Sequence, residues 1–275
     1  MTRRLLFVSG LVALLGLPGG AQAPRVLPYD HIHLAAADPD KAYAWYFEHL
    51  SGQDGENAGR MIFEPFTGRR PLPVQLMFIK APEAPPSEGS IIASIGFSVA
   101  DVEARVRRLE AAGARVVTPA RDVPGLWTQA VVVDPFGITI ELVDDRDHRG
   151  FHHITLRVPD VEASVRWFLA AFGGERTKLR GRLEALQYDH TFIVFQQGQG
   201  APSEGRAIDH LGWTPRSIDA LQADLTTKGV TFTTGPSPKP NQFGHRTGYV
   251  VAPGGARIEL VEHAACKWGQ VEGTR

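Results

Sequence analysis

The chain has 275 residues, of which 43% are hydrophobic and 21% are charged, and its formal net charge is −1. This composition is typical of a globular protein with a full apolar core, and the length allows two domains. The near-neutral charge and the lack of a long basic run argue against a nucleic-acid partner. The single cysteine, Cys266, excludes an internal disulfide.

The first 23 residues have the pattern of a secretory signal peptide. Arg3 and Arg4 give a positive start, Leu5–Leu17 is almost wholly apolar, and a small-x-small Ala-Gln-Ala sequence ends at Ala23. The apolar stretch is too short to cross a bilayer core of roughly 30 Å as a helix. We therefore expect cleavage after Ala23 and export to the periplasm or the medium, with an uncleaved N-terminal anchor as the alternative.

The rest of the chain repeats one pattern four times: a short strand, a turn led by a polar capping residue, and an amphipathic helix. The strand-and-turn segments are 30–38, 93–101, 152–160 and 209–217. The first three end in an aspartate, which is a favoured residue at a helix N-cap. The spacing predicts helices over Pro39–Leu50, Val102–Ala112, Val161–Phe172 and Ile218–Lys228.

Strand-like alternation follows each helix, and two hairpin turns match closely. The expected strands include Val74–Ile79, Ala130–Val133, Ile138–Val143, Thr191–Phe195, Tyr249–Val251 and Arg257–Val261. The turns Asp134–Gly137 and Ala252–Gly255 are each followed by Ile-Glu-Leu-Val. The chain is therefore predicted to be α+β, with four βαβββ modules in two consecutive pairs. These pairs are an N-terminal domain, 24–146, and a C-terminal domain, 150–265, joined by a polar linker.

Two motifs of these modules carry a family resemblance: the His-x-x-Leu-x-Val-x-Asp strand and the Pro-x-Gly turn that precedes Ile-Glu-Leu-Val. Together they resemble the vicinal oxygen chelate superfamily, which includes glyoxalase I, extradiol dioxygenases and fosfomycin or bleomycin resistance proteins. The resemblance implies that each pair of modules curls into an open, cup-shaped mixed β-sheet. It also implies that a metal or a substrate lies inside the cup.

The resemblance places metal ligands on the first and last strands of the modules. Those positions in the C-terminal pair are His153, His210 and Glu259. Residues two apart on a strand share a face, so Glu259 and Arg257 are expected to face one way and Ile258 and Leu260 the other, toward the helices. Two imidazoles and one carboxylate leave open positions on a six-coordinate ion and suit Fe(II), with Mn(II) or Zn(II) as alternatives.

The corresponding positions of the N-terminal pair hold an incomplete set. His31 and Glu141 occupy ligand positions, but Ser94 stands where the second histidine is expected. A serine hydroxyl is a poor ligand for a borderline metal. We therefore expect the N-terminal pair to be a structural domain with a relict, metal-free site.

Further residues near the expected centre suggest a reaction. The segment around His190 resembles the extradiol strand that carries an acid/base histidine, and Tyr249 has the spacing of the tyrosine that hydrogen-bonds the substrate in that family. An imidazole can move protons near neutral pH, and a phenol can donate to an oxyanion. His245, Asn241 and Arg246, on the loop before Tyr249, are candidates for binding an anionic substrate group.

Three functions remain open at this level. The first is an exported, metal-dependent extradiol-type dioxygenase acting on a small molecule such as an aromatic diol. The second is a glyoxalase-type lyase or isomerase, although the third module has no glutamate on its last strand to supply a fourth ligand. The third is a non-catalytic protein that binds a small molecule. No membrane partner is expected after signal cleavage, and a homo-oligomer remains open.

Overall fold

A computed structural model describes residues 26–50, 53–54, 60–63, 74–189 and 191–263 of the chain. The predicted signal peptide and Cys266 lie outside these residues. Within the described ranges, no helix combines the length and the apolar character needed to cross a bilayer.

The described residues form four helices, and each lies where the sequence predicts it. They are α1 (Pro39–Leu50), α2 (Val102–Ala111), α3 (Val161–Phe172) and α4 (Ile218–Thr227). The predicted N-caps are confirmed for α2 and α3, because the side chains of Asp101 and Asp160 accept hydrogen bonds from backbone N–H groups three residues on. Ser217 caps α4 in the same way. These caps satisfy N–H groups that a helix leaves without a partner.

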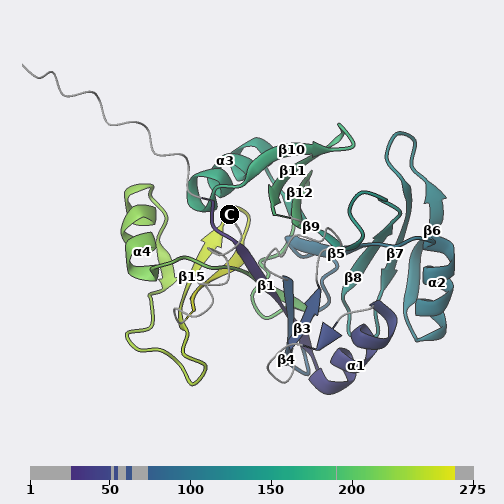
Figure 1. Cartoon of the computed structure of the whole chain (residues 1–275), viewed down its shortest axis with the longest axis horizontal. Coiled ribbons are helices and arrows are strands. Elements are labelled where there is room, and N and C mark those ends of the chain that lie inside the picture. Colours follow the sequence, from purple (N-terminus) through teal and green to yellow (C-terminus); the bar gives the residue numbers. More distant parts are fainter. Residues whose placement is uncertain (1–25, 51–52, 55–59, 64–73, 190, 264–275) are drawn as a thin grey trace, which may run out of the picture.

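The described strands form two open sheets of eight strands each, which lie side by side with α4 and α2 on opposite outer sides (Figure 1). The first has the order β14-β15-β16-β13-β1-β4-β3-β2, and the second has the order β10-β11-β12-β9-β5-β8-β7-β6. The strands of the first sheet are β1 (Tyr29–Ala36), β2 (Gln53–Asp54), β3 (Arg60–Phe63), β4 (Val74–Lys80), β13 (Ile208–Trp213), β14 (Phe232–Thr234), β15 (Arg246–Ala252) and β16 (Ala256–Glu262). Those of the second are β5 (Ile92–Ser98), β6 (Arg115–Asp122), β7 (Thr128–Val133), β8 (Thr139–Val143), β9 (Gly150–Val158), β10 (Glu175–Leu179), β11 (Leu183–Tyr188) and β12 (Thr191–Gln197).

The modules pair differently from the expected arrangement. The first module shares a sheet with the fourth, and the second shares a sheet with the third. Strand β1 runs antiparallel to β13, and β5 runs antiparallel to β9. Each sheet is thus an open cup of two modules, as the sequence implies, but consecutive modules are combined only in the second.

The connections between modules give the physical reason for this exchange. The short connector 144–149 lets β9 return beside β5 in the same sheet. The longer connectors 81–91 and 198–207 pass from one sheet to the other and run alongside each other. There the N–H of Ile91 donates to the carbonyl of Ala201, and the N–H of Ala201 donates to the carbonyl of Gly89, each at 2.8 Å.

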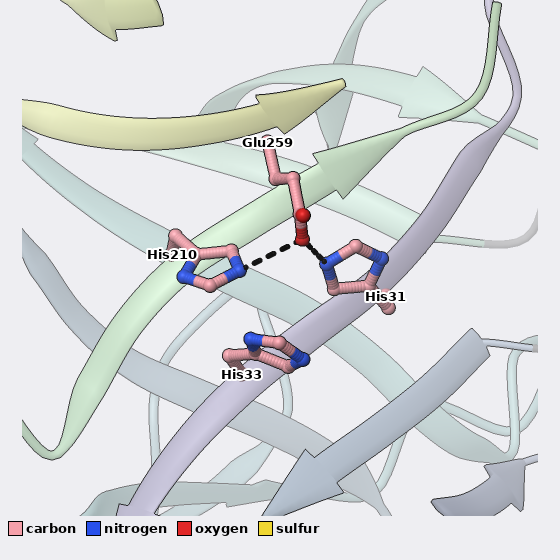
Figure 2. Close-up of side chains that lie close together, drawn as sticks. All are labelled: His31, His33, His210 and Glu259. Carbon is pink, nitrogen blue, oxygen red and sulfur yellow. Dashed lines mark hydrogen bonds and ion pairs between the residues drawn. The ribbon is translucent and has the colours of Figure 1, made fainter. Parts of the chain in front are cut away.

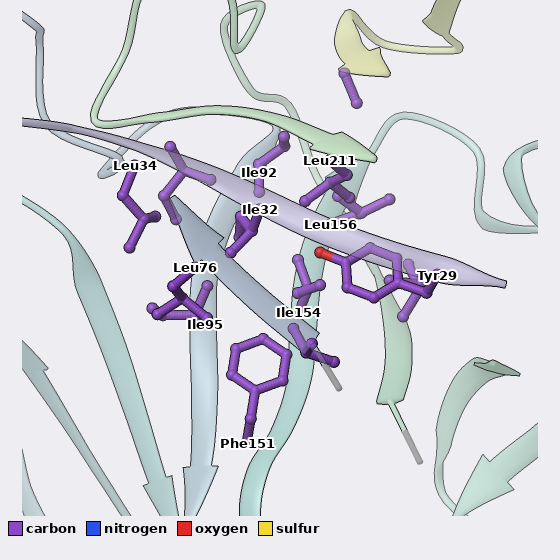
Figure 3. Packing of buried hydrophobic residues seen from close by; sticks show 14 of the residues in the cluster. Tyr29, Ile32, Leu34, Leu76, Ile92, Ile95, Phe151, Ile154, Leu156 and Leu211 are labelled. Carbon is purple, nitrogen blue, oxygen red and sulfur yellow. The ribbon is translucent and has the colours of Figure 1, made fainter. Parts of the chain in front are cut away.

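The core extends between the two sheets (Figure 3). Ile32 and Leu211 of the first sheet and Ile95 and Ile154 of the second belong to one cluster and are fully buried. Burying such a side chain contributes roughly 1.5–3 kcal/mol. Because side chains alternate along a strand, burial of Ile32 against the second sheet turns its neighbour His31 toward the opposite face of β1.

Candidate metal centre

Three side chains from adjacent strands of the first sheet converge on one point (Figure 2). They are His31 of β1, His210 of β13 and Glu259 of β16. The Nε2 atoms of His31 and His210 lie 3.0 Å and 3.1 Å from the same carboxylate oxygen, Oε2 of Glu259. All three residues are buried, with 6% exposure or less. The order β16-β13-β1 brings them together although they are far apart in the sequence.

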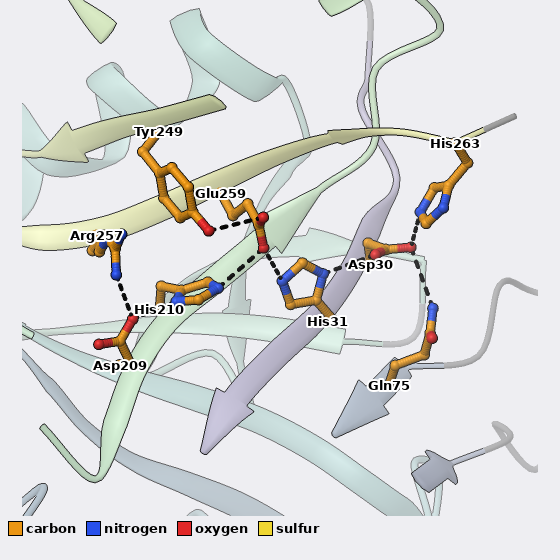
Figure 4. Close-up of polar contacts among 9 residues, drawn as sticks. All are labelled: Asp30, His31, Gln75, Asp209, His210, Tyr249, Arg257, Glu259 and His263. Atoms are coloured by element: carbon orange, nitrogen blue, oxygen red, sulfur yellow. Dashed lines mark hydrogen bonds and ion pairs between the residues drawn. The ribbon is translucent and has the colours of Figure 1, made fainter. Parts of the chain in front are cut away.

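An aspartate orients each of the two histidines (Figure 4). Nδ1 of His31 lies 2.8 Å from Oδ2 of Asp30, and Nδ1 of His210 is in hydrogen-bond contact with Asp209. A carboxylate only accepts hydrogen bonds, so each Nδ1 carries a proton, and loss of any second ring proton would leave Nε2 with a lone pair for a metal. A carboxylate behind the imidazole is the usual support of a metal-bound histidine.

The geometry and charge of the cluster fit a divalent metal ion. Nε2 of His31 is buried and has no hydrogen-bond partner among the described residues, although Glu259 approaches it. With metal–ligand bonds of about 2.0–2.2 Å, ligands at right angles lie roughly 3.0 Å apart, which matches the observed separations. Arg257 neutralises Asp209 at 2.9 Å, and among the described residues no lysine or arginine pairs with Asp30 or Glu259. A divalent cation would balance those two charges.

A third imidazole lies beside the centre. The His33 ring is 4.2 Å from the His210 ring and 4.9 Å from the His31 ring, measured between centroids. One nitrogen of His33 lies within 4.8 Å of the ligand atoms of the other three side chains. His33 is therefore placed either to act as a fourth ligand or to exchange protons with a molecule bound at the centre.

The titration of these groups reflects their burial and their close contacts. Burial would raise the pKa of Glu259, but contacts with His210 and His31 hold that pKa well below its usual value. Burial would lower the pKa of His31, but contacts with Asp30 and Glu259 raise it to about 9. Burial lowers the pKa of His33 well below its usual value, and the charges of His31 and His210 add to this effect. Without metal, protons hold the centre together, and metal binding would release them.

Tyr249 and Arg257 complete one side of the centre. Tyr249 faces Glu259 across the β15–β16 pair, and its hydroxyl donates to Oε1 of Glu259 at 2.9 Å. The Arg257 guanidinium lies 4.1 Å from the centre of the Tyr249 ring and also binds Asp209. The spacing of ten residues between Tyr249 and Glu259 thus corresponds to a direct cross-strand contact.

The opposite side opens into a pocket of about 260 Å³. Its walls include the phenyl ring of Phe243, the side chain of Met77 and the imidazoles of His33, His245 and His263. A chain of contacts links the centre to this wall. Nε2 of His263 lies 3.0 Å from Oδ1 of Asp30, and Nδ1 of His263 lies 3.2 Å from Nδ1 of His245.

Comparison with known proteins agrees with this architecture. Residues 29–142 and 150–260 each match the family model described as the Glyoxalase/Bleomycin resistance protein/Dioxygenase superfamily. The chain belongs to this superfamily. The expected family membership is thereby confirmed.

Solved structures of this superfamily share the fold. The chain is similar to glyoxalase I from Zea mays, with 18% identity, a TM-score of 0.65, and coverage of 91% of this chain and 96% of the other. It is also similar to a proposed dioxygenase from Bacillus subtilis, with 16% identity, a TM-score of 0.61, and coverage of 87% and 86%. No curated protein sequence matches the chain. The structural matches extend over nearly the whole length, so the similarity concerns both cups.

The superfamily positions named from the sequence are distributed over both sheets. His210 and Glu259 meet as expected, but the third residue that joins them is His31 and not His153. His153 lies on β9 in the second sheet, where its Nε2 is 3.6 Å from Oε2 of Glu141. The reason is the exchange of sheet partners, because β1 occupies the place beside β13 that β9 was expected to take.

The cup of the second sheet has a hydrogen-bonded network in the equivalent place. Ser94 and Thr155 donate to Oε1 of Glu141, and Gln129 donates to Oε2 at 3.0 Å. Burial would raise the pKa of Glu141, but the contacts with His153, Ser94 and Thr155 lower it to about 2. These donors satisfy the carboxylate without a cation, and Ser94 stands where the first sheet has His210.

The remaining predicted residues have different positions. His190 lies outside the described residues, and the strands on either side of it, β11 and β12, belong to the second sheet. Asn241 and His245 line the pocket beside the centre, and the Asn241 side chain also accepts backbone hydrogen bonds within its loop. The guanidinium of Arg246 is held by Asp219 at 2.7 Å and 2.9 Å. A substrate role for these residues stays a prediction.

Sequence reasoning gave Asp30, Asp209, His33 and His263 no role at the centre. One signal was present in the sequence. An Asp-His pair occurs at 30–31 and at 209–210, whereas the equivalent place in the third module reads His-His at 152–153. The aspartate that orients a ligand histidine thus marks the first and fourth modules as the two that form the centre.

Proposed function

We propose that the protein is a metal-dependent enzyme of the extradiol dioxygenase type, with a divalent metal held by His31, His210 and Glu259. The observation that carries this proposal is the convergence of two oriented imidazole nitrogens on one carboxylate oxygen at 3.0–3.1 Å. Two histidines and one carboxylate on one face leave open positions for both a substrate and dioxygen, which is the arrangement suited to Fe(II). Mn(II) and Zn(II) remain alternatives for the metal.

The surrounding side chains suit a small substrate that carries hydroxyl groups. A bound metal would supply Lewis acidity and sites for oxygen ligands. His33, neutral because burial lowers its pKa, can accept a proton from a substrate hydroxyl. Tyr249 holds Glu259 in place through its hydroxyl. The pocket beside these groups, of about 260 Å³, suits a single aromatic ring, and Phe243 offers a face for packing against it.

The test compares His31→Ala with His153→Ala in protein purified without oxygen. These two histidines occupy equivalent positions in the two sheets, so His153→Ala is a matched control. We expect His31→Ala to lose both the bound iron and the oxygen uptake measured with a panel of catechols, and His153→Ala to keep both. Iron bound to the wild type without oxygen consumption on any catechol would refute the dioxygenase proposal.

A second candidate, a glyoxalase-type lyase or isomerase, is favoured by one observation. His33 offers a fourth nitrogen at the centre, and such enzymes commonly use four protein ligands. This reaction needs no oxygen, so turnover of an α-ketoaldehyde adduct under anaerobic conditions, abolished by Glu259→Gln, would identify it. Small-molecule binding that survives Glu259→Ala, without turnover, would instead identify a non-catalytic binding protein.

Export of the mature chain is a separate proposal, supported by the charged, apolar and small-residue segments of the first 23 residues. We expect the exported fraction of expressing cells to contain a chain that begins at Pro24. N-terminal sequencing checks this, and a chain that keeps residues 1–23 in a membrane fraction would indicate an anchor.

A further inference from the structure

A second cluster of metal-ligating side chains lies outside the centre described above. It is built by the connector between β8 and β9 and by β9 itself. Nδ1 of His148 lies 3.0 Å from Oδ2 of Asp145, and Nε2 of His152 lies 3.2 Å from the same oxygen. The three ligand atoms lie within 4.8 Å of one another. Asp145 and His152 are buried, whereas the His148 side chain is 33% exposed.

The environment of the cluster holds these three side chains in place. Arg180 donates to Oδ1 of Asp145 at 2.7 Å, which leaves Oδ2 directed at the two imidazoles. The ring of Phe192 lies 5.0 Å from the His148 ring and 5.5 Å from the His152 ring. Trp127 packs edge-on against His152, at 5.4 Å between centroids. A hydrogen-bonded carboxylate and packed imidazoles are what a preorganised metal site requires.

The neighbouring histidine allows a tautomer of His152 that presents a lone pair to the cluster. Two imidazoles, His152 and His153, stand in a row between the carboxylates of Asp145 and Glu141, with their Nδ1 atoms 2.7 Å apart. Either ring can donate the proton of the Nδ1–Nδ1 contact, and Nε2 of His153 lies 3.6 Å from Glu141, beyond hydrogen-bond distance. If His152 donates to His153, its Nε2 lone pair faces the carboxylate of Asp145. A cation between them would turn that repulsive contact into two coordinate bonds.

We propose that Asp145, His148 and His152 bind a divalent transition metal of the Zn(II) class, with water from the exposed side of His148 as the fourth ligand. Two imidazoles and one carboxylate match the ligand preference of this borderline ion. Zinc bonds of about 2.0–2.2 Å place tetrahedral ligands roughly 3.3–3.6 Å apart, slightly wider than the observed 3.0 Å and 3.2 Å. The ion would tie the connector between the second and third modules to β9. It would also fix the proton of His153 toward Glu141.

The test measures zinc bound to the full chain after removal of metal and dialysis against Zn(II) alone. We expect His148→Ala to bind one equivalent of zinc fewer than the wild type. Asp147→Asn is the matched control, because this carboxylate lies on the same connector, is 73% exposed and approaches Arg180 instead of the imidazoles. It should bind as many equivalents as the wild type. Circular dichroism should confirm that both variants are folded, as expected for exchanges at the surface.

A variant of the first centre separates this inference from the proposed function. His31→Ala should lose a different equivalent of zinc, and the double variant with His148→Ala should lose both. If His148→Ala binds zinc with the stoichiometry and affinity of the wild type, the second site does not exist. If His31→Ala binds as much zinc as the wild type while His148→Ala binds one equivalent fewer, the proposed centre fails and the connector site stands.

Discussion

Gly212 lies directly beneath the His31 ring, and adding one methyl group there should disrupt the proposed centre. The two residues are partners in the β1–β13 pair. A Cβ atom at position 212 would lie 2.1 Å from Cε1 of His31, whereas real Cβ contacts stay above 3.0 Å. In Gly212→Ala the imidazole of His31 must therefore move by at least about 0.9 Å, away from the point that it shares with His210 and Glu259.

The size of this shift predicts a large effect on the centre and a small effect on stability. Adding a methylene to a packed core costs roughly 1–3 kcal/mol. Replacing glycine by alanine within a strand returns about 0.5–1 kcal/mol. A displacement of about 1 Å, however, is enough to lower the rate of a positioned reaction by roughly 100-fold. Loss of a residue that hydrogen-bonds a metal ligand lowers metal affinity by roughly 10–100-fold. We expect Gly212→Ala to lower it at least as much, because the ligand itself is displaced.

The assay titrates purified protein with metal and follows the one equivalent of metal that His31→Ala fails to bind. Thermal unfolding of the same variants is measured alongside. Gly96→Ala is the matched control, since a Cβ at Gly96 would lie 2.1 Å from Cε1 of His153, the equivalent ring of the second sheet. It should unfold at a similarly lowered temperature and keep the His31-dependent metal. If Gly212→Ala binds that metal as tightly as the wild type does, the assignment of His31 as a ligand is wrong.

Three further predictions concern groups around the two cups. Asp30→Asn should weaken metal binding by roughly 10–100-fold in a titration, because the amide no longer fixes the tautomer of His31 as a carboxylate does. Tyr249→Phe should keep the bound metal, measured by elemental analysis, but lower turnover, since Glu259 loses its 2.9 Å hydrogen bond. The pKa of Glu141 is lowered to about 2, so this group stabilises the fold above its unfolded pKa of 4.5, and that contribution is lost as pH falls from 4.5 toward 2. Acid unfolding of Glu141→Gln should show a weaker pH dependence in that window, and an unchanged profile would contradict the assignment.

Local structure was predictable because local signals determine it. The helices begin where Asp101 and Asp160 cap them, and these caps were visible as aspartates at the end of each strand segment. The turn at Asp134–Gly137 forms the predicted β7–β8 hairpin, with Gly137 at a φ of 85°. The second turn, Ala252–Gly255, forms the equivalent β15–β16 hairpin.

The pairing of modules was not predictable from the same signals. All four modules carry one pattern, so each first strand can pair with any other without changing the alternation of its buried residues. The choice depends on the connectors, where 144–149 is short enough to keep β9 beside β5 and 81–91 is long enough to leave the sheet. When modules exchange partners, the ligand positions within one module stay together. His210 and Glu259 belong to the same module and were therefore placed together correctly, whereas His153 belongs to another module and was not.

Besides the exchange of His210 for Ser94, the two cups differ in the residue that precedes the β1 or β9 histidine. His31 and His153 occupy equivalent positions, each over a glycine of the neighbouring strand. Asp30 can only accept a hydrogen bond, so Nδ1 of His31 is a donor, and Nε2, which faces Glu259, is the nitrogen that would bind a cation. Nδ1 of His152 can either donate to or accept from Nδ1 of His153 at 2.7 Å, so it does not fix which nitrogen of His153 carries the proton. The exchange of a carboxylate for an imidazole thus changes the partner of Nδ1 in the next ring, which separates His31, the proposed ligand, from His153.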